Sequence, residues 1–300
     1  MTIRNQIWGF ALLCTLSVLC WWHALAKTIE LALNNDAYTH ILLILPLTVS
    51  LIYLDRSRWQ RNEEDAPLAL FRGRMGAGAT ALAGGALILC FARWGQSHLN
   101  ISPGGQLSLS MFALVIWWIA SVILCFGVQL FRSFLFPLCF LFWMVPLPPF
   151  ALGRIVLFLQ QQSAMAARIL FLAAGVPVTQ HGFILSIPNL DIEVASECSS
   201  IRSSLLLIVI AMVLANLFLR TRWRKTLVVA AAIPLAVAKN GLRIFTIAEL
   251  GTRVDPGFLT GKFHHHGGIV FLGIAVVAVC AVLWVLRRSE ASSVSAASRN

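Results

Sequence analysis

Residues 191–219 read DIEVASECSSIRSSLLLIVIAMVLANLFL, a polar segment that turns into an apolar one as long as a membrane span. A helix needs about 20 consecutive apolar residues to cross the hydrocarbon core of a bilayer. This chain therefore predicts an all-α, multi-spanning membrane protein with about eight transmembrane helices. The eight predicted spans are 7–25, 38–54, 75–94, 109–127, 133–149, 199–219, 226–247 and 267–286.

Charged residues are scarce, and their positions predict the orientation of the chain. Of the 300 residues, 59% are hydrophobic and 12% are charged, whereas about a quarter of a soluble domain is charged. The net charge of +11 at pH 7 is spread over clusters between the predicted spans, unlike the single basic surface of a nucleic-acid-binding protein. With both termini in the cytoplasm, every cluster lies on the cytoplasmic side, as the positive-inside rule requires. The clusters are Arg4; Arg56, Arg58, Arg61, Arg72 and Arg74; Arg220, Arg222, Arg224 and Lys225; and Arg287 and Arg288.

From this distribution we expect a multi-pass protein of the inner (cytoplasmic) membrane, surrounded by lipid and without a nucleic-acid partner. The predicted organisation is one transmembrane domain over residues 1–288, followed by a disordered cytoplasmic tail over 289–300. Within that domain, residues 1–149 hold the first five spans, 150–197 form an extracytoplasmic cap, and 198–288 form a three-helix part.

The cap is expected to combine a helix with a β-hairpin. Its first half places Arg154 and Gln160 among apolar residues, a pattern typical of an amphipathic helix lying in or dipping into the outer interface. Its second half alternates apolar and polar residues on both sides of Pro188-Asn189, which predicts a hairpin with its turn at that dipeptide. The hairpin leads directly to the sixth span.

Cys198 differs from the other six cysteines, which lie inside long apolar runs. It is at the predicted start of a helix, and Arg202 follows one turn later. The amides of a helix N-terminus and a nearby guanidinium both favour a thiolate, the reactive form of cysteine. A packing role for the thiol is the alternative.

Three polar groups converge on the outer face in the predicted topology. Cys198 lies at the outer end of the sixth span, Arg243 in the outer third of the seventh, and a run of three histidines at the outer mouth of the eighth. An arginine within a span costs several kcal/mol unless it is paired or faces water, so we expect Arg243 to be functional. Snorkelling to the interface, or neutralisation of Glu249, is the alternative. Asn240 shares a helical face with Arg243 and is expected to orient it.

The histidine run, His264, His265 and His266, does not have the spacing of a metal site. Adjacent residues on a helix point about 100° apart, so the three cannot face one ion, and the chain has no His-x-x-x-His motif. We expect no metal and no cofactor, and one histidine acting as a base.

Three blocks of sequence resemble the signature blocks of the exosortase/archaeosortase family in order and spacing. They are ECSSIRS at 197–203, KNGLRI at 239–244 and FHHHGGIVF at 263–271, and the resemblance extends over roughly residues 180–275. It implies a membrane-embedded cysteine protease or transpeptidase. By position, Cys198 matches the nucleophile, Arg243 the arginine that stabilises the oxyanion, and His264 the general acid and base. His266 is the alternative for the last role.

The resemblance also implies the partners of the protein. The substrates are exported proteins with a C-terminal sorting signal, made of a short motif such as Pro-Glu-Pro, a transmembrane helix and a basic cluster. The enzyme passes the cut chain to an unknown surface acceptor, a glycoconjugate or a lipid, through a thioacyl intermediate. Transfer to water instead makes it a plain protease. A transporter or assembly component for polysaccharide export is the alternative from another class, and it predicts broken helices in corresponding positions of two halves.

Overall fold

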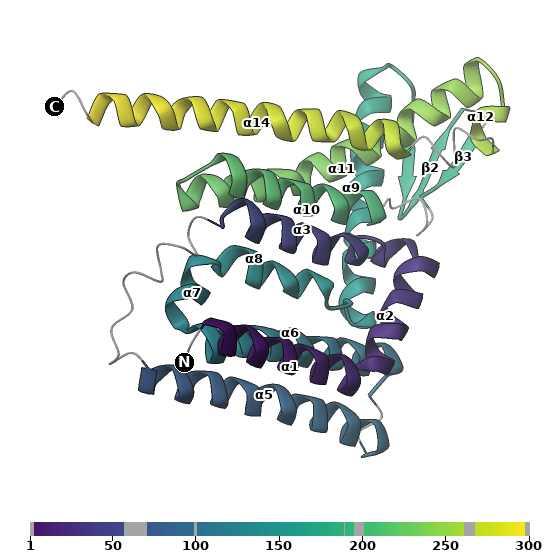
Figure 1. Ribbon diagram of the computed structural model, residues 1–300. Coiled ribbons are helices and arrows are strands. Elements are labelled where there is room, and N and C mark those ends of the chain that lie inside the picture. Colours follow the sequence, from purple (N-terminus) through teal and green to yellow (C-terminus); the bar gives the residue numbers. More distant parts are fainter. Residues whose placement is uncertain are drawn as a thin grey trace. The chain divides into compact units, whose positions relative to one another are not determined.

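The computed structural model describes residues 3–56, 71–98, 101–188, 190–194, 201–260 and 268–297. The chain divides into two compact units, unit 1 over Met1–Ala151 and unit 2 over Leu152–Asn300. Both units are built mainly from helices, as the ribbon in Figure 1 shows.

Unit 1 is an all-helical unit with its core around α6. Its elements are α1 (Ile3–Cys20), α2 (Trp22–Asn34), the short η1 (Asp36–Tyr38), α3 (Ile41–Leu54), α5 (Phe71–His98), α6 (Pro103–Phe126), α7 (Val128–Ser133), α8 (Leu135–Phe140) and η3 (Leu141–Met144).

Indole N–H groups hold the N-terminal helices of unit 1 to α6. Trp21 Nε1 donates to Ser110 O at 2.7 Å, and Trp118 Nε1 donates to Ser17 Oγ at 2.8 Å. A buried indole N–H needs an acceptor, so these bonds fix the contact of α1 and α2 with α6.

Unit 2 combines long helices with a small sheet. Its elements are α9 (Pro149–Ala173), almost all of which lies in this unit, β1 (Thr179–His181), β2 (Ile184–Ile187), β3 (Leu190–Glu193), α10 (Ile201–Phe218), α11 (Arg222–Arg253), α12 (Gly257–Thr260) and α14 (Gly268–Ala297). The three strands are antiparallel in the order β1-β2-β3.

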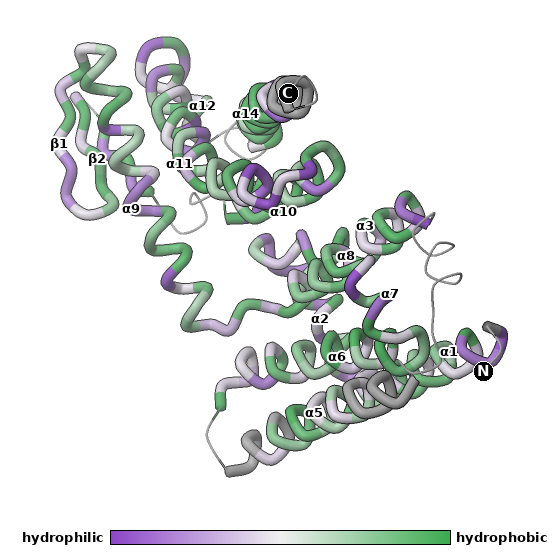
Figure 2. Tube along the Cα trace, turned by 90° about the vertical axis from the view of Figure 1, so that its left-hand side faces the viewer, coloured by the Kyte–Doolittle hydropathy of each residue, from purple (hydrophilic) through white to green (hydrophobic). Residues whose placement is uncertain are grey.

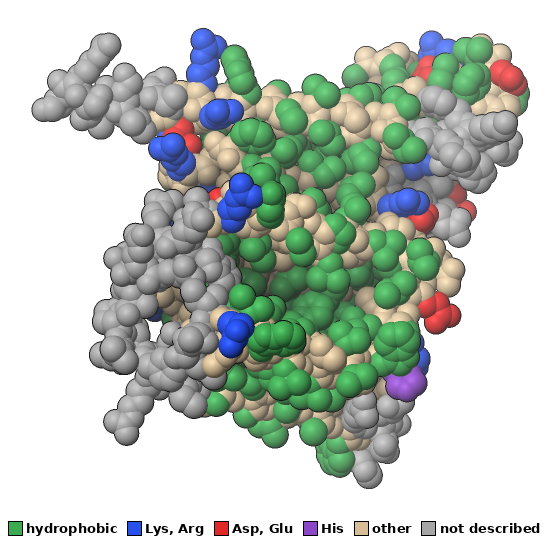
Figure 3. All heavy atoms as spheres, viewed as in Figure 1, with side chains coloured by type: hydrophobic (Ala, Val, Ile, Leu, Met, Phe, Trp, Pro, Cys, Tyr) green, Lys and Arg blue, Asp and Glu red, His purple; other side chains and the backbone are tan. Residues whose placement is uncertain are grey.

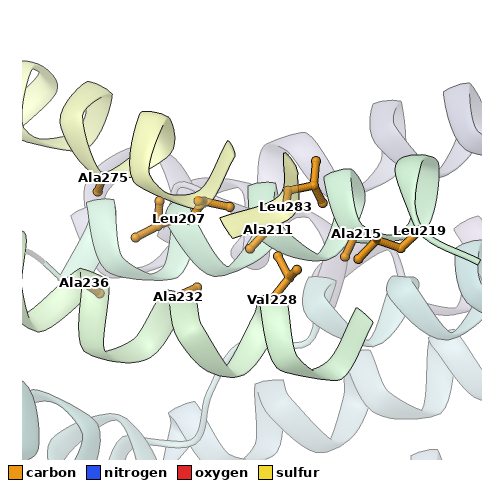
Figure 4. Close-up of a cluster of buried hydrophobic side chains, with 10 residues drawn as sticks. Leu207, Ala211, Ala215, Leu219, Val228, Ala232, Ala236, Ala275 and Leu283 are labelled. Carbon is orange, nitrogen blue, oxygen red and sulfur yellow. The ribbon is translucent and has the colours of Figure 1, made fainter. Parts of the chain in front are cut away.

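Small side chains allow α10, α11 and α14 to pack closely in unit 2. Their shared core, drawn in Figure 4, contains alanine at several contact positions. Small residues let helix backbones approach in a membrane, where dispersion contacts rather than the hydrophobic effect drive association. The buried members of this core are Leu207, Ala211, Ala215, Leu219, Val228, Ala232, Ala236, Ala275, Val279 and Leu283.

The outward-facing side chains of the helices suit a lipid environment. On α14, Ile269, Val277 and Trp284 are all more than half exposed. Figures 2 and 3 show apolar residues along the helices, with hydrophilic and charged ones nearer to helix ends and in the sheet. An apolar surface of this kind is stable in hydrocarbon rather than in water.

Six helices among the described residues are long and apolar enough to cross a membrane, or seven if the bent pair α1 and α2 forms one span. The all-α multi-spanning fold predicted from the sequence is thereby confirmed. The six are Asp36–Leu54, Pro103–Phe126, Pro149–Ala173, Ile201–Phe218, Arg222–Arg253 and Gly268–Glu290.

The first and fifth predicted spans differ from this set. The predicted 7–25 span is replaced by α1 and α2, which meet at an angle of 72°. The predicted 75–94 span lies inside α5, a helix of 28 residues, which is long enough to contain it. The 133–149 region breaks into short helices because prolines interrupt it, and proline removes a backbone donor and clashes with the preceding turn.

The cap region contains the predicted helix and hairpin. The helix, α9, is 25 residues long and apolar enough to cross a membrane, which the prediction of an interfacial helix did not anticipate. The hairpin pairs Ile187 with Leu190, so its turn begins at the predicted Pro188. The edge strand β1 was not predicted, because its sequence, Thr-Gln-His, has no apolar alternation.

The carboxylate of Glu290 ties α14 to the start of α11. It accepts hydrogen bonds from Thr221 N at 2.8 Å, from Arg220 N at 3.2 Å and from the Thr221 hydroxyl. Arg224 Nη1 lies 3.9 Å from the same carboxylate. A negative group at this position satisfies orphan amides and complements the helix dipole.

We expect Glu290→Ala to lower the free energy of unfolding by about 1–2 kcal/mol, because charge-assisted hydrogen bonds are lost. Thermal unfolding in detergent micelles measures the change. The matched control is Glu30→Ala, since Glu30 is exposed on α2. Equal unfolding temperatures for the two variants would show that the Glu290 contacts add no stability.

Candidate functional site

The start of α10, a polar turn of α11 and the start of α14 lie at one end of unit 2. Lys239 Nζ donates to Ser203 Oγ at 2.5 Å, which joins this turn of α11 to the first turn of α10. At the opposite end, Lys225 Nζ donates to Asn216 Oδ1 at 3.0 Å, so α10 and α11 are antiparallel. Glu290 contacts Thr221 at that same opposite end, which makes α14 antiparallel to α11 as well.

Cys198 and the three histidines lie outside the described residues. In the sequence, Cys198 precedes the first residue of α10 by three positions, and His264 precedes the first residue of α14 by four. The first described residues of α10 and α14 lie at the same end of unit 2 as the Lys239–Arg243 turn of α11. The convergence of the thiol, the guanidinium and the imidazole stays a prediction.

The turn of α11 from Lys239 to Arg243 contains buried polar side chains. Lys239 is 5% exposed and Asn240 is 1% exposed. Arg243 is half-buried and lies one turn after Lys239, on the same helical face. Two basic side chains on one face of a helix repel each other when both are charged.

Glu249 is not available to neutralise this charge. Its carboxylate pairs with Arg253 Nε at 2.7 Å, one turn further along α11. The alternative role for Arg243, neutralisation of Glu249, is thus filled by Arg253. Arg202, on α10, is exposed and precedes the Ser203 that contacts Lys239.

Asn240 binds the neighbouring helix α9. Its Nδ2 donates to Ser163 Oγ at 2.9 Å, and both side chains are buried. The next residue, Gly241, lies so close to α9 that an added Cβ would be 2.6 Å from Ala166 Cβ and 3.0 Å from Ala167 N. A glycine is needed here for a close backbone approach.

A second buried hydrogen bond joins α9 to the chain that leads toward Cys198. Gln160 Nε2 donates to Val194 O at 3.0 Å. Gln160 and Ser163 are three residues apart, so they lie on one face of α9. The core around them also includes residues of the sheet and of α11, namely Leu185, Ile187, Val194, Ile244 and Ala248.

Gln160, Ser163, Ser203 and Lys239 were not singled out as site residues from the sequence. The available signal was a pair of polar residues at helical spacing within an apolar helix, which indicates a polar contact between helices. Their partners are distant in the sequence, so the contacts themselves follow only from the packing.

No group of three or more histidine, cysteine or acidic side chains that could hold a metal occurs within the described part of the chain. The described site instead contains an amine, a guanidinium and a side-chain amide that can donate hydrogen bonds, from Lys239, Arg243 and Asn240. Such a set suits an anion or a developing negative charge rather than a cation.

Cations of the opposite end form a separate group. Arg224 contacts Glu290, Arg287 lies over the ring of Phe218, and Arg288 lies over that of Trp284. The two ends of the group formed by α10, α11 and α14 therefore differ. One end carries a cluster of arginines, and the other carries a buried polar turn beside the sheet.

Comparison with known families gives one assignment. The family model of the transmembrane exosortases matches residues 21–284, which is most of the chain. Searches of curated proteins and of solved structures give no match. The matched region includes all three sequence blocks and the helices that carry them. The chain therefore belongs to the transmembrane exosortase family.

Proposed function

We propose that this protein is a membrane-embedded cysteine transpeptidase that cuts the C-terminal sorting signal of exported proteins. The observation that carries the proposal is the Lys239–Ser203 hydrogen bond, which holds the turn bearing Arg243 against α10. Ser203 follows Cys198 by five residues. This contact supports the proposal, because the helix that follows Cys198 in the sequence packs against the helix that carries Arg243.

The length of α11 supports an active site at the extracytoplasmic boundary. From Lys225, in the arginine-rich end, to Arg243 the helix rises about 27 Å, close to the ~30 Å thickness of the hydrocarbon core. α11 has 32 residues, a length of about 48 Å, so its last turns extend beyond the hydrocarbon. The sheet packs against Ile244 and Ala248 in those turns. With the arginines in the cytoplasm, the site faces the outside of the inner membrane.

In the proposed reaction the Cys198 thiolate attacks the carbonyl carbon of the scissile peptide bond. A carbon–sulfur bond forms, the carbon–nitrogen bond breaks, and the leaving amine takes a proton from His264. Arg243 stabilises the oxyanion formed between these events, an effect that is largest where water is scarce. A hydroxyl or amine of the acceptor then attacks the thioester and gives up its proton to the histidine, and the carbon–sulfur bond breaks to free the thiolate.

The transporter alternative gains less support from the fold. It needs broken helices in corresponding positions of the two halves. The bent pair α1 and α2 provides a break in unit 1, but α10, α11 and α14 run as single helices over their described residues. The family assignment also favours protein sorting.

Mass spectrometry of the C-terminus of a co-produced substrate tests the proposed function. The substrate should carry a signal peptide, a reporter domain and a sorting signal from the same genome, and the control lacks the signal. A shortened C-terminus with an added mass is the expected result, because the acceptor remains attached. A free carboxylate at the cut would show hydrolysis instead of transpeptidation. An uncut substrate would contradict the proposal.

A further inference from the structure

Val194 is the last described residue before the segment 195–200, which carries Cys198. Val194 is 1% exposed, its carbonyl accepts from Gln160 of α9, and its N–H donates to Phe183 O at 2.9 Å. Both backbone groups of Val194 are therefore satisfied by the protein, and the entry to the segment is held by α9 and the hairpin.

Ser203, three residues after that segment, is also held by a neighbouring helix. Ser203 lies in the first turn of α10 and accepts from Lys239 of α11. Within the described residues, this hydroxyl is the hydrogen-bond acceptor that Lys239 contacts. An ammonium buried to this extent is costly unless it is hydrogen-bonded. This cost opposes any movement of α10 relative to α11 that would break the bond.

The two anchoring helices are themselves locked together beside Arg243. Asn240, next to Lys239, donates to Ser163, three residues after Gln160. Gly241 brings the backbones of α9 and α11 into direct contact. Val194 is thus linked through α9, and Ser203 directly, to the same turn of α11 that carries Arg243.

We propose that Gln160 and Lys239 are positioning residues: they hold Val194 and Ser203, the contacted residues before and after Cys198 in the sequence, in register with the turn of α11 that carries Arg243. The proposal rests on the proposed function, because it assigns the thiol as the nucleophile. Its physical reason is geometric: a displacement of about 1 Å between a nucleophile and the group that stabilises its transition state lowers the rate by about 10²-fold.

The chain supplies a matched control for a merely structural role. Lys225 of α11 donates to Asn216 of α10 at the opposite end of the same helix pair. If Lys239 served only to join α10 to α11, Lys225→Met would have the same effect on activity as Lys239→Met.

The experiment compares Lys239→Met, Ser203→Ala, Gln160→Met and Lys225→Met in the full-length enzyme, with kcat and KM measured on a peptide spanning the sorting motif. We expect kcat to fall about 10- to 100-fold in the first three variants, with KM within about threefold of the wild type. Lys225→Met should keep its kcat within about twofold.

The double variant Lys239→Met, Ser203→Ala should be no slower than the slower single variant, because both substitutions remove the same hydrogen bond. Lys239→Arg, which keeps a donor, should recover most of the rate.

A second readout depends on the thiol and not on the substrate. In a chain whose other six cysteines are alanine, the rate of alkylation of Cys198 by iodoacetamide is followed against pH. Ser203→Ala keeps every charge and removes one oxygen. It should lower that rate at pH 7 about 3- to 10-fold, because the groups that stabilise the thiolate would no longer be aligned with it.

Unchanged alkylation in Ser203→Ala and Gln160→Met, or equal loss of kcat in Lys239→Met and Lys225→Met, would overturn the positioning role. Failure of the proposed function has a different signature. In that case a Cys198→Ala enzyme still processes the substrate, whatever the alkylation rates are.

Discussion

Replacing Cys198 with alanine should abolish processing of the sorting signal, with a loss of at least about 10³-fold in rate. The reason is chemical: without the thiolate no covalent intermediate forms, and neither the arginine nor the histidine can take over the attack on the carbonyl. The amount of protein in the membrane should be unchanged. Immunoblotting of a tagged substrate in cells measures the ratio of cut to uncut chain.

Two cysteine variants complete this test. Cys280→Ala serves as the matched control, because Cys280 is an exposed thiol on α14, and it should process normally. Cys198→Ser keeps the size of the side chain but replaces the thiol with a far weaker nucleophile, and it should be as inactive as alanine. Normal processing in either Cys198 variant would exclude the thiol as the nucleophile.

Gly241→Ala should disrupt the site almost as severely, although it adds only one methyl group. The new Cβ would lie 2.6 Å from Ala166 Cβ and 3.0 Å from Ala167 N. The second of these atoms is backbone, so α9 and α11 must move apart to relieve the contact. Overpacking of this kind costs about 1–3 kcal/mol. We expect processing to fall about 10²-fold, because the crossing sets the position of Arg243.

Gly273→Ala on α14 is the control for the glycine substitution. Nothing lies within 4 Å of a Cβ built at Gly273, so alanine should leave both stability and processing unchanged or slightly improved. The two variants are compared by thermal unfolding in detergent and by the rate of substrate cleavage. Wild-type behaviour in Gly241→Ala would show that α9 and α11 do not need their close crossing for activity.

The sequence predicted the class of fold well because span length is a local property. The apolar runs that became α3, α6, α10, α11 and α14 could be read directly, since each must fill the hydrocarbon with few charges. The hairpin was also predictable, from alternation and a turn dipeptide. Breaks within apolar segments were not, because a bend such as that between α1 and α2 depends on packing rather than on hydropathy.

The candidate site was predictable in part for a related reason. Arg243 and Asn240 stand out because polar residues inside a span are costly, and this signal is again local. Gln160, Ser163 and Ser203 gave no such signal, since one amide or hydroxyl on a helix is inexpensive when the backbone or a neighbour can bind it. Their importance comes from partners 34, 77 and 36 positions away in the chain.

Detection of a thioacyl-enzyme on Cys198 tests the central claim most directly. Purified enzyme is mixed with a substrate peptide in the absence of any acceptor, quenched in acid and digested, and the peptide containing Cys198 is examined by mass spectrometry. We expect its mass to rise by that of the N-terminal part of the substrate, and treatment with hydroxylamine to remove the addition. An acyl group on another residue, or cleavage of the substrate with Cys198 replaced by alanine, would contradict the account.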